Sequence, residues 1–107
     1  MPENFYYVKM IEQHNERLVA VCDKEIIGVP LMSSKVKIRA SHKFYGEELM
    51  TGTKVLKELK NCTSANVIGV NIISLLLEHR FISKEAILWL ENPNDKSQKV
   101  GHAIIIF

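Results

Sequence analysis

The sequence predicts an α+β fold in a single small domain, with a mixed or antiparallel sheet of about five strands and two helices in the order β-β-β-α-α-β-β. Aromatic and β-branched residues, which favour strands, crowd both ends of the chain. Two segments between them, 53–60 and 67–79, are predicted as helices. The length of 107 residues matches one domain without a linker.

The first two strands are predicted as a hairpin. Residues 5–11 and 17–22 are both rich in residues that favour strands, and the polar cluster 13–16 separates them. The second run is apolar on both faces, which is typical of a central strand that is covered on each side. Residues 26–30 are predicted as an irregular connection, because they contain a glycine and a proline, which lacks an amide donor.

The clearest strand is predicted over 35–40, where cationic and apolar residues alternate strictly. Residues 41–52 contain two glycines and are predicted to bend twice. A short helix over 53–60 follows, because its three large apolar residues lie on one helical face and lysines cover most of the remainder.

The second helix is predicted to run from Val67 to Glu78 or His79, and it is apolar nearly all round. We therefore expect either sheet and helix together or a partner chain to cover it. Gly69 would weaken this helix by about 1 kcal/mol relative to alanine, so a close backbone contact is expected there. Three polar residues are candidates for its N-terminal cap: Thr63, Ser64 and Asn66.

Two further strands are predicted near the end of the sequence. Residues 87–90 lead into a turn over 92–95, and residues 100–107 are strongly β-prone. So apolar a tail is expected to be paired on both sides or buried at an interface. Trp89 is interpreted as a core residue.

Composition narrows the class of protein. Lysine and arginine exceed aspartate and glutamate by two, which is too small an excess to indicate nucleic-acid binding.

The first four residues lack the pattern of a secretory signal, and the longest apolar stretch, 67–77, is too short to span a bilayer. We therefore expect a cytoplasmic protein with no membrane partner. Cys22 and Cys62 are then expected to be reduced, with Cys22 buried and Cys62 accessible.

The best functional signal is a set of cations. Lys35, Lys37 and Arg39 are predicted to project from one strand face about 7 Å apart, which is close to the phosphate spacing of a nucleic-acid backbone. Lysines at every third position of the first helix would extend the same surface: Lys54, Lys57 and Lys60. These six cations are our predicted binding residues for RNA or a ribonucleoprotein. More often, however, such cations only cover a solvent-exposed face.

No motif indicates a catalytic, metal or cofactor site. Four residues of types that ligate metals lack the spacing of a shared site: His42, Glu47, Glu48 and His102. Glycine-rich phosphate-binding motifs and nucleophile motifs are absent from the sequence. We therefore predict no cofactor and no metal, and a non-catalytic role is favoured.

Four segments together resemble the archaeal family known as domain of unknown function 424. They are residues 18–28, residues 44–49 with Phe44-Tyr45-Gly46, Ala65-Asn66-Val67-Ile68-Gly69 and Gly101-His102-Ala103. The resemblance covers most of the chain in the same order. It implies an archaeal cytosolic protein, and it supplies no substrate, cofactor or catalytic residue.

Polar and glycine residues of these segments are predicted to form one candidate pocket: Tyr45, Gly46, Glu47, Asn66, Gly69 and His102. In the predicted topology the loop after 35–40, the start of the second helix and the last strand meet, and the N-terminus of that helix would suit an anion. Two alternatives to RNA binding thus stay open. One is a small ligand- or metal-binding, enzyme-like protein, and the other is a homodimer formed through helix 67–79 or the C-terminal strand.

Overall fold

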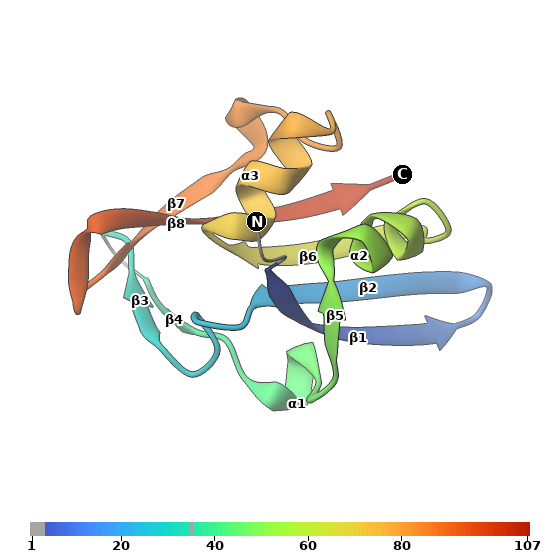
Figure 1. Ribbon diagram of the computed structural model, residues 1–107, viewed down its shortest axis with the longest axis horizontal. Helices are drawn as coiled ribbons and strands as arrows, with labels where there is room; N and C mark the ends of the chain where they lie inside the picture. Colours follow the sequence, from blue (N-terminus) through green and yellow to red (C-terminus); the bar gives the residue numbers. More distant parts are fainter. Residues whose placement is uncertain (1–3, 35) are drawn as a thin grey trace.

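Eight strands form one mixed sheet in the computed structural model, which describes residues 4–34 and 36–107 (Figure 1). The strands are β1 (Phe5–Gln13), β2 (Glu16–Asp23), β3 (Pro30–Met32), β4 (Lys37–Arg39), β5 (Leu49–Thr51), β6 (Ser64–Gly69), β7 (Leu88–Asn92) and β8 (Asp95–Ile106). They lie side by side in the order β4-β3-β7-β8-β6-β2-β1-β5. Paired strands are antiparallel except β2 and β6, which run parallel.

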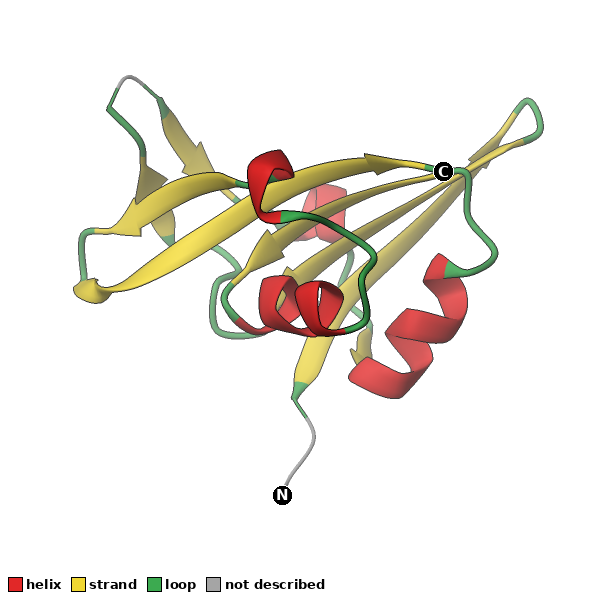
Figure 2. Ribbon diagram, turned by 90° about the horizontal axis from the view of Figure 1, so that it is seen from above, coloured by secondary structure: helices red, strands yellow, loops and turns green. Residues whose placement is uncertain are grey.

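Helices cover only part of this curled sheet (Figure 2). They are α1 (His42–Tyr45), α2 (Gly52–Leu59), α3 (Asn71–Glu78) and the 3-10 helix η1 (Lys84–Ala86). The helices α2 and α3 pack on one face over β1, β2 and β6, around buried residues such as Val21 and Val67. The helix α1 closes part of the other face, around Cys22 and Ile68. Among the described residues, no helix has the length and apolar character needed to cross a membrane.

The predicted arrangement of about five strands and two helices is wrong. The described residues form eight strands and three α-helices in the order β-β-β-β-α-β-α-β-α-β-β, with η1 before the last two strands. Four of the elements that were not predicted, β3, α1, β5 and η1, have three or four residues each. Periodicity cannot reveal such short elements, because they form by contact with distant parts of the chain. By contrast, the first hairpin and the first helix are found near their predicted bounds, as β1–β2 and α2.

The largest error concerns residues 64–69, which form the central strand β6 instead of opening the predicted helix 67–79. β6 pairs with β2 on one side and with β8 on the other, and Ala65, Val67 and Ile68 are completely buried. A strand that is buried on both faces has a continuous apolar sequence, so its pattern resembles that of a buried helix. The helix α3 begins only at Asn71. All three predicted caps lie before or within β6.

The N-terminus of α3 is capped by a distant strand. Asp23, the last residue of β2, is buried, and its carboxylate accepts backbone N–H bonds from Val70 (2.8 Å), Asn71 (2.7 Å) and Ile72 (2.9 Å). The first N–H groups of a helix have no partner inside the helix, and a negative charge suits the positive end of the helix dipole. The anion predicted for the N-terminus of the second helix is therefore supplied by the protein itself.

Gly69 makes room for this cap. Its φ of 151° lies in a region that favours glycine, and an added Cβ would overlap the carboxylate of Asp23. The close contact that the sequence predicts at Gly69 therefore exists, although it occurs at the end of a strand and not inside a helix.

Burial and hydrogen bonding act on Asp23 in opposite directions. Burial raises the pKa of the Asp23 carboxyl because it disfavours the charged form, whereas the three backbone N–H bonds lower the pKa, and the net shift is upward. The folded state therefore binds more protons than the unfolded state above the usual pKa of about 3.9. The contribution of Asp23 to stability consequently falls as the pH rises through the interval between the two pKa values.

Replacing Asp23 by asparagine should destabilise the fold. The amide would keep one acceptor oxygen and direct an NH2 group at a backbone donor, so a buried N–H of α3 would lose its partner. We expect the free energy of unfolding at pH 7 to fall by about 1–3 kcal/mol in urea unfolding followed by circular dichroism. Asp95→Asn is the matched control, because Asp95 is an exposed residue at the start of β8 that accepts a bond from the Ser97 N–H. Equal losses in the two variants would contradict the capping role.

Candidate functional site

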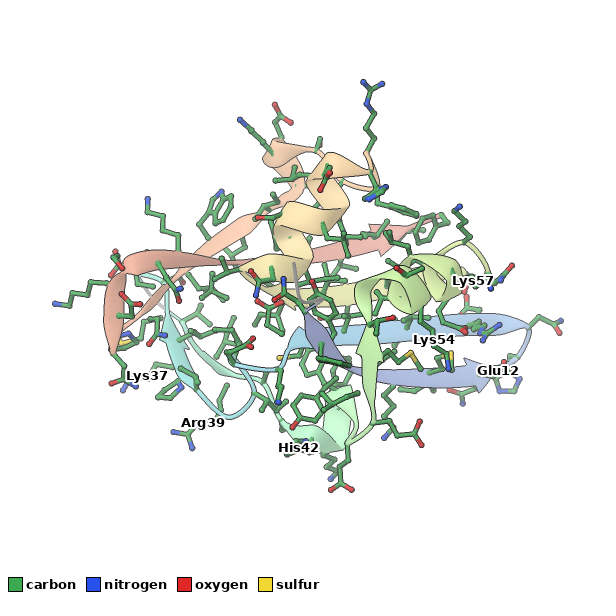
Figure 3. The ribbon with its side chains drawn as sticks, viewed as in Figure 1. Glu12, Lys37, Arg39, His42, Lys54 and Lys57 are labelled. Atoms are coloured by element: carbon green, nitrogen blue, oxygen red, sulfur yellow. The ribbon has the colours of Figure 1, made fainter. Side chains whose placement is uncertain are left out.

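The predicted nucleic-acid-binding cations do not gather on one surface. Lys37 and Arg39 lie on β4, at one edge of the sheet (Figure 3). The opposite edge is formed by β5, which leads directly into α2. Lys54 and Lys57 lie on this helix, and Lys60 is the residue at its C-terminal cap. Lys35 lies outside the described residues. The described cations therefore form two separate groups, and the continuous basic surface expected from the sequence is not present.

A row of paired residues crosses four strands at the β4 end of the sheet. Lys99 on β8 lies opposite Glu91 on β7, and Met32 on β3 is paired with both Glu91 and Lys37 on β4. Directly paired residues point to the same face of a sheet, as do residues two apart along one strand. We name the resulting surface the Trp89 face and define it by six residues: Met32, Lys37, Arg39, Trp89, Glu91 and Lys99.

The Trp89 face is exposed to solvent in all six of its residues. Trp89 itself is 44% exposed, so the prediction that it belongs to the core is wrong. Its neighbour on β8 is Gly101, and side chains of Ile73 and Ile87 pack over that glycine. These two isoleucines fill the core where the indole was expected. The face thus combines three cations, one acid and an exposed aromatic ring.

A cavity of about 750 Å³ adjoins Trp89, between β7 and the hairpin of β3 and β4. It is present because β3 and β7 are paired at one position only, after which the N–H of Ser33 bonds to the carbonyl of Val36 (2.9 Å) and the chain turns away from β7. A space of this size with apolar walls and a few polar groups is typical of a binding site. Its lining includes Met32, Trp89, Pro93, Ser34, Glu91 and Lys96.

Tyr45, Asn66 and His102 form a hydrogen-bonded network on the opposite face of the sheet. The Tyr45 hydroxyl donates to Asn66 Oδ1 at 2.7 Å, and His102 Nε2 lies 3.1 Å from the same oxygen. Because an amide oxygen only accepts, Nε2 carries the hydrogen in this contact and Nδ1 is left as an acceptor. Burial lowers the pKa of His102 and raises the pKa of Tyr45, to which the nearby Cys22 adds. Both groups are therefore neutral near pH 7.

The other residues of the predicted pocket lie elsewhere. Gly46 ends α1 with a φ of 81°, and a Cβ at this position would lie 3.0 Å from the carbonyl oxygen of Val8. Glu47 is exposed and lines a separate hollow of about 580 Å³. Gly69 contacts Asp23, on the face that carries α3. The structure thus brings together three of the six residues, in the Tyr45–Asn66–His102 network.

Neither cysteine is suited to nucleophilic chemistry. Both are buried and unpaired, and the prediction that Cys62 is accessible is wrong, because it packs in the core beside α2 with its thiol donating to the Leu59 carbonyl (3.2 Å). Burial raises the pKa of Cys22 to about 12 and also raises the pKa of Cys62. In the part of the chain that the structure describes, no group of three His, Cys, Asp or Glu is placed to hold a metal ion.

The lowered pKa of His102 predicts a pH dependence of stability. Above the folded pKa and below the unfolded value of about 6.5, the unfolded state binds more protons, so stability falls as the pH drops through this interval. We expect His102→Gln to lose less stability than the wild type on acidification. Thermal unfolding would be measured between about pH 7.5 and about pH 5, an interval that spans the usual histidine pKa. The exposed His79, changed to glutamine, is the control. An unchanged pH profile in His102→Gln would contradict a partly buried, neutral His102.

Comparison with known proteins shows which family this chain belongs to. A solved structure described as an uncharacterized conserved protein from Methanopyrus kandleri is similar to this chain with a TM-score of 0.70 at 16% identity, over 95% of this chain and 92% of that chain, which shows a shared fold. No curated protein matches the chain. Residues 11–101 match the family described as "Protein of unknown function (DUF424)", in agreement with the resemblance seen in the sequence. The chain therefore belongs to the DUF424 family.

Proposed function

We propose that this protein is a non-catalytic module that binds single-stranded RNA through the Trp89 face. The observation that carries the proposal is a tryptophan, 44% exposed, that shares one face of the sheet with exposed cations on β4 and β8. Proteins that bind single strands combine a positively charged surface with aromatic rings on which bases stack. Both parts of this combination occur here on adjacent strands.

The charges of the Trp89 face suit a phosphate backbone. Lys37 and Arg39 alternate on β4, so their side chains project about 7 Å apart, which is near the phosphate spacing of an extended strand. Lys99 lies two strands beyond β3 and adds a third cation, while Glu91 is the single acid of the face. In the salt bridges found among the described residues, none of these three cations takes part. They are therefore available to phosphate groups.

The cavity beside Trp89 suits a base. Its volume of about 750 Å³ lies within the range of small-molecule sites, and the indole forms one wall of it. Stacking of one base on an aromatic ring contributes about 1–3 kcal/mol and tolerates any sequence. Ser33, Ser34 and Lys96 line the same space. Hydroxyl and ammonium groups are donors that suit a base edge or a phosphate.

We assign no RNA contact to Lys54, Lys57 and Lys60, because they lie at the other edge of the sheet.

RNA binding is also favoured over a ligand site at His102. In the Tyr45–Asn66–His102 network, the Tyr45 hydroxyl and the His102 Nε2 group are already used in internal hydrogen bonds.

Replacing Trp89 by alanine should weaken RNA binding by about 5- to 150-fold, which corresponds to the loss of about 1–3 kcal/mol of stacking. The affinity for a labelled oligouridylate would be measured by fluorescence anisotropy. Phe5→Ala is the matched control, because Phe5 is 45% exposed and lies on β1, away from β7 in the sheet. Trp89 is also the only tryptophan of the chain, so RNA should quench the intrinsic fluorescence of the wild type. Equal affinities of Trp89→Ala and the wild type would refute the stacking role.

The two groups of cations should differ in the salt dependence of RNA binding. Each phosphate contact on a single strand adds about 0.7 to the slope of log affinity against log salt concentration. Lys37→Gln, Arg39→Gln and Lys99→Gln combined should therefore make the slope shallower by about 2. The matched triple variant of α2, with glutamine at positions 54, 57 and 60, should keep the wild-type slope. A larger effect of the α2 triple would place RNA on the opposite edge and overturn the proposal.

A further inference from the structure

The second half of β8 has a partner on one side only. β7 and β8 are paired as far as Leu88 opposite His102, whereas β6 and β8 stay paired as far as Ser64 opposite Ile106. Figure 1 shows β8 running on toward the C-terminal end after β7 has turned away. Residues 103–106 therefore form an open strand edge within the sheet.

The open edge offers four backbone groups. The N–H of Phe107 donates to the carbonyl of Thr63 at 3.0 Å, which makes these two residues a hydrogen-bonded pair. Hydrogen-bonded pairs alternate along an antiparallel ladder, so Ile105 bonds to β6 as well. The N–H and C=O groups of Ile104 and Ile106 consequently point the other way, toward the open edge.

The side chains at this edge are apolar and exposed. Ile106 is 84% exposed and Ile104 is 62% exposed, the highest values among the large hydrophobic side chains that the structure describes. Leu88, on the same face and opposite His102, is 47% exposed. Residues 100–107 contain no Asp, Glu, Lys or Arg. Proteins usually protect an exposed edge with charged side chains, and this edge has none.

We propose that this edge is the interface with a second copy of the same chain, paired antiparallel about a two-fold axis at Ile105. In this register Ile104 of each copy lies opposite Ile106 of the other, and each of these two pairs exchanges two N–H···O=C bonds. The four free groups of each copy are then all used. The exposed isoleucines pack against one another across the axis, as expected of an isologous contact.

The edge itself favours a second copy over a different protein. It has only two residues with free backbone groups, and the two-fold register satisfies each group once, without a remainder. Residues 100–107 contain no Asp, Glu, Lys or Arg, and His102 is neutral near pH 7. Two copies therefore meet without repulsion between like-charged side chains. Lys99, the residue of β8 that belongs to the Trp89 face, lies toward the other end of the strand, so dimer formation leaves RNA binding possible.

Sedimentation of the full chain over a range of concentrations tests the interface. We expect a dimer, twice the 12.2 kDa of one chain. Ile106→Lys places like charges near each other across the axis and should raise the dimer dissociation constant by at least about tenfold. Leu49→Lys is the matched control, because Leu49 is exposed on the edge strand β5, which is not a neighbour of β8, and it should leave the dimer unchanged. A monomer at every concentration, or a dimer that Leu49→Lys and not Ile106→Lys disrupts, would overturn the proposal.

Disulfide cross-linking tests the register. In the proposed register, Ile105 of one chain lies opposite Ile105 of the other chain in a non-hydrogen-bonded pair. The two Cα atoms of such a pair are about 4.5 Å apart, which is within disulfide range. Ile105→Cys should therefore cross-link under mild oxidation, while the native cysteines are buried. Ile104→Cys lies opposite position 106 and should cross-link far less. Efficient cross-linking of Ile104→Cys without Ile105→Cys would refute this register. Neither experiment involves RNA, so its outcome is independent of the proposed function.

Discussion

The hydrogen bonds from the first turn of α3 to Asp23 fix the centre of the sheet. They join the end of β2 to the point where β6 passes into α3, so the only parallel pair of paired strands among the described residues is fastened at one end. β8 pairs with β6 from Gly69 opposite Gly101 onward. The same junction therefore sets the position of β8, and through it that of β7. Both the Trp89 face and the Tyr45–Asn66–His102 network depend on this arrangement.

The sequence reveals those parts of the fold that are decided locally. The hairpin of β1 and β2 has strong strand formers and a polar turn, and α2 has an apolar face, so both are predictable. The junction of β6 and α3 is decided by a contact across 48 residues, since Asp23 caps a helix that begins at Asn71. The glycine at position 69 is the one local signal of that contact. Its true meaning, room for a carboxylate, appears only when β2 is placed beside β6.

The candidate site was predictable to a similar extent. The alternation around Lys37 and Arg39 indicates a strand with a basic face, and this face exists. What the sequence could not show is that α2 lies at the other edge of the sheet, because strand order is set by long-range pairing. Trp89 was missed for a related reason. Tryptophan favours the core, and only the packing of Ile73 and Ile87 over Gly101 shows that the core is already full at that point.

Short helices leave both ends of β8 uncovered. α2 and α3 have eight residues each, or about 12 Å of helix, whereas eight strands spaced about 4.8 Å apart span roughly 34 Å. The helix α3 lies over β6 and β2, and α2 lies over β2, β1 and β5, so the ends of β8 extend beyond their cover. One end carries Lys99, and the other carries Ile104 and Ile106. Because charge protects a strand from pairing with another strand and isoleucine does not, the two proposals assign different partners to the two ends of one strand, a charged polymer and a second strand.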